Sequence, residues 1–214
     1  MQERGPHVRL LQGPLTGDSL EDEIARALAS PAPVDLDRAV AGWLRTLWAV
    51  GAWLREQHAV SYDDGEPPTW HQPPWVPAPH RSSLATWSRL LARGGTRLHG
   101  PLGLDHIHRT PSGTVDVVAP ERRTGHPAAD VGGVVADLLR LETEVAPPRA
   151  AHLGRLVTAF TASYCGLPPT SRVDEVALRR AIALRSVHRS GDDAPDATRT
   201  RIRALVEQSW LTVD

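Results

Sequence analysis

Between Arg97 and Asp130 the sequence gathers imidazole and carboxylate side chains, the two types that most often accept protons or bind metal ions in proteins. Asp105 or Asp116 is a candidate general base, and a zinc ion accepts both Asp and His as ligands. No spacing among these residues is specific for one chemistry, so we predict no assigned catalytic group, no metal and no cofactor. The candidates are His99, Asp105, His106, Asp116 and Glu121.

The elements expected to position these residues are a loop, a β-hairpin and a helix. Two β-rich runs, His106–Thr110 and Thr114–Val118, are separated by Pro111-Ser112-Gly113, which is typical of a tight turn. A loop containing Gly and Pro follows. We expect a helix to begin near Ala128–Asp130.

This order of elements resembles the aminoglycoside phosphotransferase/choline kinase-like family. Its members carry His-Gly-Asp in the catalytic loop, then an Asn, then a metal-binding Asp at the end of the second strand. Here His99-Gly100 match the first two motif residues, but Pro101 stands at the base Asp, His106 at the Asn and Ala119 at the metal Asp. The resemblance implies that Asp130 is the family's structural Asp on the following helix.

The substitutions remove groups that phosphoryl transfer needs, namely a carboxylate for the attacking hydroxyl and oxygen ligands for Mg²⁺. Proline accepts no proton, alanine offers no ligand, and imidazole suits Mg²⁺ poorly. The chain also contains no Lys and no Asn, since all 24 of its Lys and Arg residues are Arg. We therefore expect a protein that is not an active kinase.

Helical periodicity predicts a mainly α (α+β) fold with about seven helices around the short hairpin. Ser19 and Asp22 have the spacing of a capping box, and Asp35–His58 is the strongest helix, with Trp43 and Trp48 on its predicted apolar face. The other predicted helices are Ser83–Ala92, Asp130–Val145, Ala150–Cys165, Val173–Ser190 and Pro195–Leu211.

By resemblance, this is a kinase-like C-terminal lobe that begins at the hinge strand, Val8–Gln12. Leu54 and His58 match the end of the family's long central helix, and Phe160 and Tyr164 match a later helix end. The resemblance implies that the N-terminal lobe, with its glycine-rich loop and Lys-bearing strand, is missing, and that the edge it covers is exposed. We expect residues 1–214 to form one such domain.

Residues 61–81 are an insert rich in Pro and Trp, whose six prolines disfavour a regular helix. Trp70, His71 and Trp75 lie between these prolines. Two interpretations stay open for them. They either bind a peptide or a partner protein, or two tryptophans attach the insert to its own domain.

Composition limits the classes of function. A net charge of −1 provides no electrostatic argument for nucleic acid or an anionic membrane, and no apolar run reaches the roughly 18 residues of a spanning helix. The N-terminus lacks a signal-like apolar region, so we expect a cytoplasmic protein. Cys165, the only cysteine, is expected to be a buried thiol, and the arginines of residues 179–189 are expected to form a solvated helix face.

Three functions remain. The first is a catalytically dead phosphotransferase-like subunit that binds a protein or peptide, or a second copy through the exposed lobe edge. By analogy with kinase-like proteins, it would serve the biosynthesis of peptide natural products. The second is an enzyme that reuses the cleft for non-phosphoryl chemistry, such as peptide cyclisation, through His99, Asp105 or His106. The third is a phosphotransferase completed by a partner chain, which the proline at position 101 disfavours.

Overall fold

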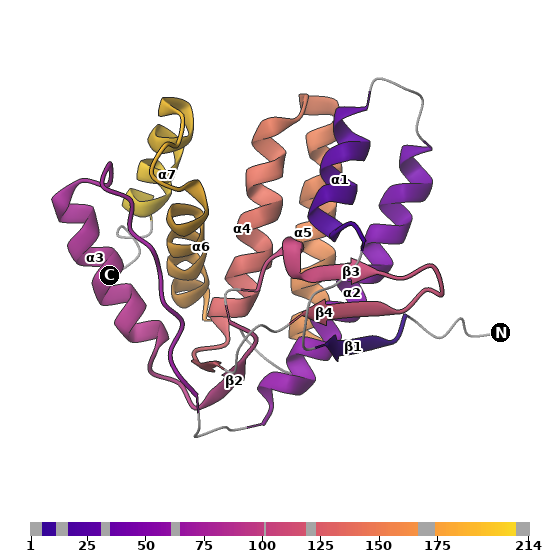
Figure 1. Ribbon diagram of the computed structural model, residues 1–214, viewed down its shortest axis with the longest axis horizontal. Coiled ribbons are helices and arrows are strands. Elements are labelled where there is room, and N and C mark those ends of the chain that lie inside the picture. Colours follow the sequence, from indigo (N-terminus) through magenta and orange to yellow (C-terminus); the bar gives the residue numbers. More distant parts are fainter. Residues whose placement is uncertain are drawn as a thin grey trace.

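The computed structural model describes residues 6–11, 17–30, 35–60, 65–100, 102–118, 123–166 and 174–208. These residues form seven α-helices and two small sheets, which confirms the predicted mainly α (α+β) class (Figure 1). The helices are α1 (Leu20–Ala29), α2 (Leu36–His58), α3 (Ala78–Leu91), α4 (Ala128–Glu144), α5 (Pro147–Cys165), α6 (Glu175–Ser190) and α7 (Asp196–Gln208).

Both sheets lie near the predicted loop and hairpin. The first sheet has the order β1-β4-β3: β3 (Ile107–Arg109) and β4 (Val115–Val118) are the predicted antiparallel hairpin, and β1 (Val8–Leu11) pairs parallel with β4. The second sheet pairs β2 (Thr96–Leu98) with β5 (Arg123–Gly125). The short 3-10 helix η1 (Leu104–His106) leads from the loop into β3. The two sheets thus hold both ends of the segment between Arg97 and Asp130 in place.

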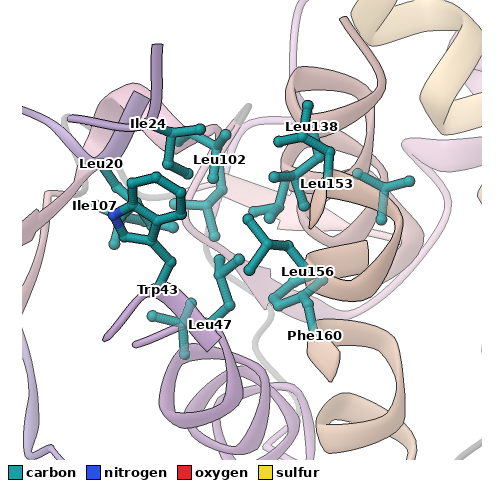
Figure 2. Close-up of a cluster of buried hydrophobic side chains, with 14 of the residues drawn as sticks. Leu20, Ile24, Trp43, Leu47, Leu102, Ile107, Leu138, Leu153, Leu156 and Phe160 are labelled. Carbon is teal, nitrogen blue, oxygen red and sulfur yellow. The ribbon is translucent and has the colours of Figure 1, made fainter. Parts of the chain in front are cut away.

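The main core lies between α1, α2, α4, α5 and the hairpin. Trp43 of α2 is fully buried beside Leu20 and Ile107, while Phe160 of α5 closes the far side (Figure 2). Burying each large apolar side chain contributes about 1.5–3 kcal/mol. A second cluster joins α3, α6 and α7 on the other side of α4.

Local signals explain where several helices begin. The predicted capping box is present: Asp22 donates its backbone N–H to Ser19 Oγ at 3.1 Å, and its carboxylate accepts from the Ser19 N–H at 3.3 Å. Asp35 caps α2 through the Arg38 N–H at 3.1 Å. Asp174 caps α6 in the same way.

Three sequence expectations are wrong in detail. Helix α3 begins at Ala78, five residues before the predicted Ser83, and α5 begins at Pro147 instead of Ala150, because prolines are accommodated in a first helical turn. Trp48, placed on the apolar face of α2, is 43% exposed. It lies at the edge of that face, where α5 covers α2 only in part.

Candidate functional site

Asp130, at the start of α4, anchors the catalytic-type loop. Its Oδ2 accepts the backbone N–H of His99 at 2.9 Å and lies 3.2 Å from His99 Nδ1 and 3.1 Å from His58 Nε2. Since His58 Nε2 donates to the carboxylate, its Nδ1 accepts from the Tyr164 hydroxyl at 2.9 Å. The resemblance implied a structural role for Asp130, matched His99 to the first residue of the catalytic motif, and matched His58 and Tyr164 to helix ends. The structure brings these four residues together.

The electrostatics of this group fit a structural role. Burial by itself raises the pKa of Asp130, but hydrogen bonds from His58 and His99 outweigh burial and lower the pKa to about 2. The side chain is therefore an anion that two rings and one amide hold in place. His99 is buried beneath the ring of Trp53, with ring centroids 4.6 Å apart. It lies on the anchoring side of the loop, away from Asp105 and His106.

Asp105, the first candidate base, is held by two arginines of α6. Its carboxylate lies 3.0 Å from Arg189 Nη1 and 3.4 Å from Arg185 Nη2. Burial raises the pKa of Asp105, but His106 and the two guanidinium groups outweigh burial and lower the pKa to about 2. A carboxylate with so low a pKa is a weak base near neutral pH.

Asp137 of α4 and Glu21 of α1 complete this ion network. Asp137 is buried, accepts the Leu104 N–H at 3.0 Å and lies 3.4 Å from Arg185 Nη2. Glu21 pairs with Arg189 at 2.5 Å. The network corrects the expected solvated face of α6, because Arg185 is only 2% exposed. Its partners lie 48 and 80 residues away in the chain, beyond the reach of local sequence patterns.

The loop backbone passes through this network at Gly103. A Cβ at that position would collide with Arg185, Asp137 and Asp105 at once. Position 103 therefore requires glycine, because charged side chains approach the backbone closely there. The loop runs between these oppositely charged side chains.

Asp116, the second candidate base, is paired across the sheet. Arg9 of β1 donates to its two oxygens from Nε and Nη2 at 2.9 and 3.0 Å. Asp116 is buried, and His108 stands opposite it on β3. The bidentate contact occupies both carboxylate oxygens, so Asp116 holds β1 against β4.

His106 and Asp105 are the candidate residues that the structure brings together. His106 Nδ1 lies 2.8 Å from Asp105 Oδ1, although the angle is too poor for a hydrogen bond. Two clusters with metal-ligand types exist among the described residues: His58, His99 and Asp130, and Glu21, Asp105 and Asp137. In both, the groups are already bonded to one another or to arginines. Pro101, Ala119 and Glu121 lie outside the described residues.

The three insert candidates contact the chain itself. Trp75 Nε1 donates to the Gly191 carbonyl at 2.9 Å, and Trp70 packs edge-on against the His188 ring. The His71 N–H donates to His188 Nδ1 at 2.9 Å. These contacts attach the insert to the end of α6. Binding of a peptide by these residues stays a prediction.

Sequence reasoning missed a broad groove beside α2. Its volume is about 1820 Å³, and its floor is the outer face of α2 with Trp48 and Trp53. The turn between β3 and β4, residues 110–114, and the start of β1 form its wall. The sequence pattern that was missed is a second stripe along α2, next to the stripe that faces the core. In this second stripe, small and aromatic residues lie between charged residues.

Buried Asp130 on α4 anchors the loop at His99, and the hairpin of β3 and β4 follows this loop, within a fold that resembles those of solved structures. A solved glucosamine kinase (crystal form B) matches it with a TM-score of 0.52 and 15% identity, over 91% of this chain and 57% of that chain. Glucosamine kinase in complex with glucosamine, ADP and inorganic phosphate matches with a TM-score of 0.45, 16% identity, and 91% and 55% coverage.

The chain thus spans less than two thirds of the length of these neighbours, and identity at this level shows the fold alone. No protein-family model and no curated protein matches the sequence. The aminoglycoside phosphotransferase resemblance therefore stays a prediction within a supported kinase-like fold. None of the helices in the described residues has the length and apolar run needed to span a bilayer.

Proposed function

We propose that this chain is a catalytically inactive phosphotransferase-like protein that works by binding another polypeptide. One observation supports the proposal above others: arginines hold both carboxylates that were candidates to replace the base at Pro101. Asp105 is bound by Arg185 and Arg189, and Asp116 is bound by Arg9. His106 and the two guanidinium groups lower the pKa of Asp105 against the effect of burial, so Asp105 has little tendency to take a proton from a hydroxyl. The contact with Arg9 occupies both carboxylate oxygens of Asp116.

The frame around these residues is nevertheless complete. Asp130 still fixes the loop through His99, and the hairpin still stands beside it. A protein that keeps the fold while its charges pair internally can bind a partner through its surface, and the groove of about 1820 Å³ along α2 is one such surface. An accessory role in peptide natural-product biosynthesis is the finer form of this proposal and rests on analogy.

Nucleotide binding tests the proposal. Thermal unfolding of the full chain, followed with and without ATP and Mg²⁺, is expected to show no change in Tm. A ligand that binds only the folded state raises the Tm, and the rise grows with the logarithm of its concentration relative to its Kd. A stabilisation of several degrees that needs both ATP and Mg²⁺ would contradict the proposal, and phosphate transfer from labelled ATP to any added acceptor would refute it.

A second function has one specific observation in its favour, the contact between Asp105 and His106 on the loop. The Asp105 carboxylate lies 2.8 Å from His106 Nδ1, and a hydrogen bond formed there on substrate binding would orient the other ring nitrogen to accept a proton. His106 is partly exposed, so this pair could act as a base in addition or cyclisation of a peptide. The test is product formation from a dehydroamino-acid peptide. Loss of product in folded His106→Ala, with His80→Ala unaffected, would favour this function over the first.

A further inference from the structure

The outer face of α2 carries one exposed stripe that the fold of a single chain leaves uncovered. Trp48 is 43% exposed there, and Val60, just beyond the helix, is 59% exposed. Arg45 and Glu56 are exposed and form no ion pair with any residue that the structure describes. The stripe is made of three exposed residues and three partly buried ones that line the same groove: Arg45, Trp48 and Glu56, and Ala49, Ala52 and Trp53.

The order of residues in this stripe has an internal symmetry about the peptide bond between Val50 and Gly51. Arg45 and Glu56 are equally far from that bond on its two sides. The same holds for Trp48 and Trp53, and for Ala49 and Ala52. Each cation therefore has an anion, each indole an indole, and each small residue a small residue as its symmetric counterpart.

Such symmetry has a direct meaning for an antiparallel pair of identical helices. In a twofold (isologous) contact, every residue meets the one that lies equally far on the other side of the axis. Arg45 of one copy would meet Glu56 of the second copy, and Trp48 would meet Trp53 of the second copy. The alanines at the centre permit close approach of the two helix axes.

The walls of the groove agree with this arrangement. The turn at residues 110–114 stands beside the N-terminal half of α2, where the Arg109 guanidinium packs on Gly42. In an antiparallel pair the turn of the second copy would lie at the opposite end of the contact from the turn of the first. The groove beside one α2 then receives the C-terminal half of the other.

We infer that two copies of this chain associate antiparallel through the outer face of α2, with the twofold axis passing between the two helices at the level of the Val50–Gly51 bond. A foreign helix or peptide would need only a complementary charge order, whereas pairing with itself requires the order found here. The inference does not depend on catalytic inactivity. A failure of the ATP experiment and a failure of the association experiment are separate results.

The experiment is a measurement of molar mass against concentration for the full chain, by light scattering after gel filtration and by sedimentation equilibrium. The wild type is expected to have twice the 23.3 kDa chain mass and to dissociate on dilution. Arg45→Glu places two like-charged pairs in the contact, and so does Glu56→Arg. Each is expected to weaken association by at least about tenfold.

Charge exchange distinguishes this contact from any other. The double variant Arg45→Glu/Glu56→Arg restores both pairs and is expected to dimerise again. An equimolar mixture of the two single variants is expected to form a heterodimer tighter than either homodimer. Arg203→Glu changes an exposed arginine on α7 and is the matched control, with no expected effect.

Three results would overturn the inference. They are a wild-type monomer at every concentration, a dimer that neither single variant weakens, and single variants that weaken a dimer which the double variant does not restore. A monomer that instead captures another protein through Trp48 would assign the groove to a different occupant and overturn it as well. Circular dichroism of each variant confirms that the helices are retained.

Discussion

Replacing Asp130 by Asn tests whether the buried anion holds the loop. The pKa of Asp130 falls from an ordinary 3.8 to about 2 in the folded chain. That difference corresponds to about 2 kcal/mol of folding free energy at neutral pH, and full burial means that solvent does not screen it. Asn keeps the shape but loses the charge, so we expect Asp130→Asn to destabilise the protein by about that amount at pH 7.

The pH dependence identifies the cause. Because the folded pKa lies below the unfolded value, the contribution is complete above pH 4 or so and is lost as the pH falls toward 2. Roughly half of it is lost by pH 3. Urea unfolding of wild type and Asp130→Asn from pH 3 to pH 7 measures the difference between their free energies of unfolding. This difference should be constant above about pH 5 and become smaller below pH 4.

Asp193→Asn is the matched control, since Asp193 is an exposed carboxylate in the turn after α6. Its free energy of unfolding is expected to stay within about 0.5 kcal/mol of wild type at every pH. If the difference in free energy of unfolding between wild type and Asp130→Asn does not change down to pH 3, the electrostatic explanation is refuted. If the two proteins do not differ in stability at any pH, the anchoring role itself is refuted.

Two further predictions concern packing and the ion network. Gly133→Ala is expected to destabilise the fold by about 1–3 kcal/mol, because the new Cβ would overlap the Leu102 carbonyl. Gly154→Ala, in open space on α5, is expected to stabilise the fold by about 0.5–1 kcal/mol. Chemical denaturation measures both variants, and a loss of stability at Gly154 equal to that at Gly133 would contradict the packing argument. Arg185→Ala removes a buried cation 3.4 Å from Asp137 and leaves Arg189, 3.5 Å away, as the remaining cation beside that carboxylate. The variant is expected to cost about 1.5–3 kcal/mol in the same assay, and a loss below about 1 kcal/mol would show that the pair is not a stabilising contact.

Local patterns predicted the helices and the hairpin well. The capping box at Ser19 and the apolar spacing of α2 depend only on residues that are close in the sequence. The same is true of the turn at Pro111-Ser112-Gly113, which lies within the hairpin it closes. Helix starts at Ala78 and Pro147 were missed because prolines were weighted as helix breakers, although the first turn of a helix tolerates them.

The roles of the charged residues depended on distant partners and could not be predicted. Asp116 looked available until Arg9, 107 residues earlier, was seen to hold it. The role of Asp105 similarly depends on its arginine partner in α6. By contrast, a structural role for Asp130 was expected from the resemblance, although its contact with His99 was not predicted.

The ion network also bears on how the chain is made. Asp105 and Asp137 place carboxylate oxygens within 4.8 Å of each other, and Arg185, which lies near both, follows them in the chain by 80 and 48 residues. While a ribosome is still synthesising α6, these acids repel without the arginines that neutralise them. We expect the loop at Gly103 to settle only once α6 has been synthesised.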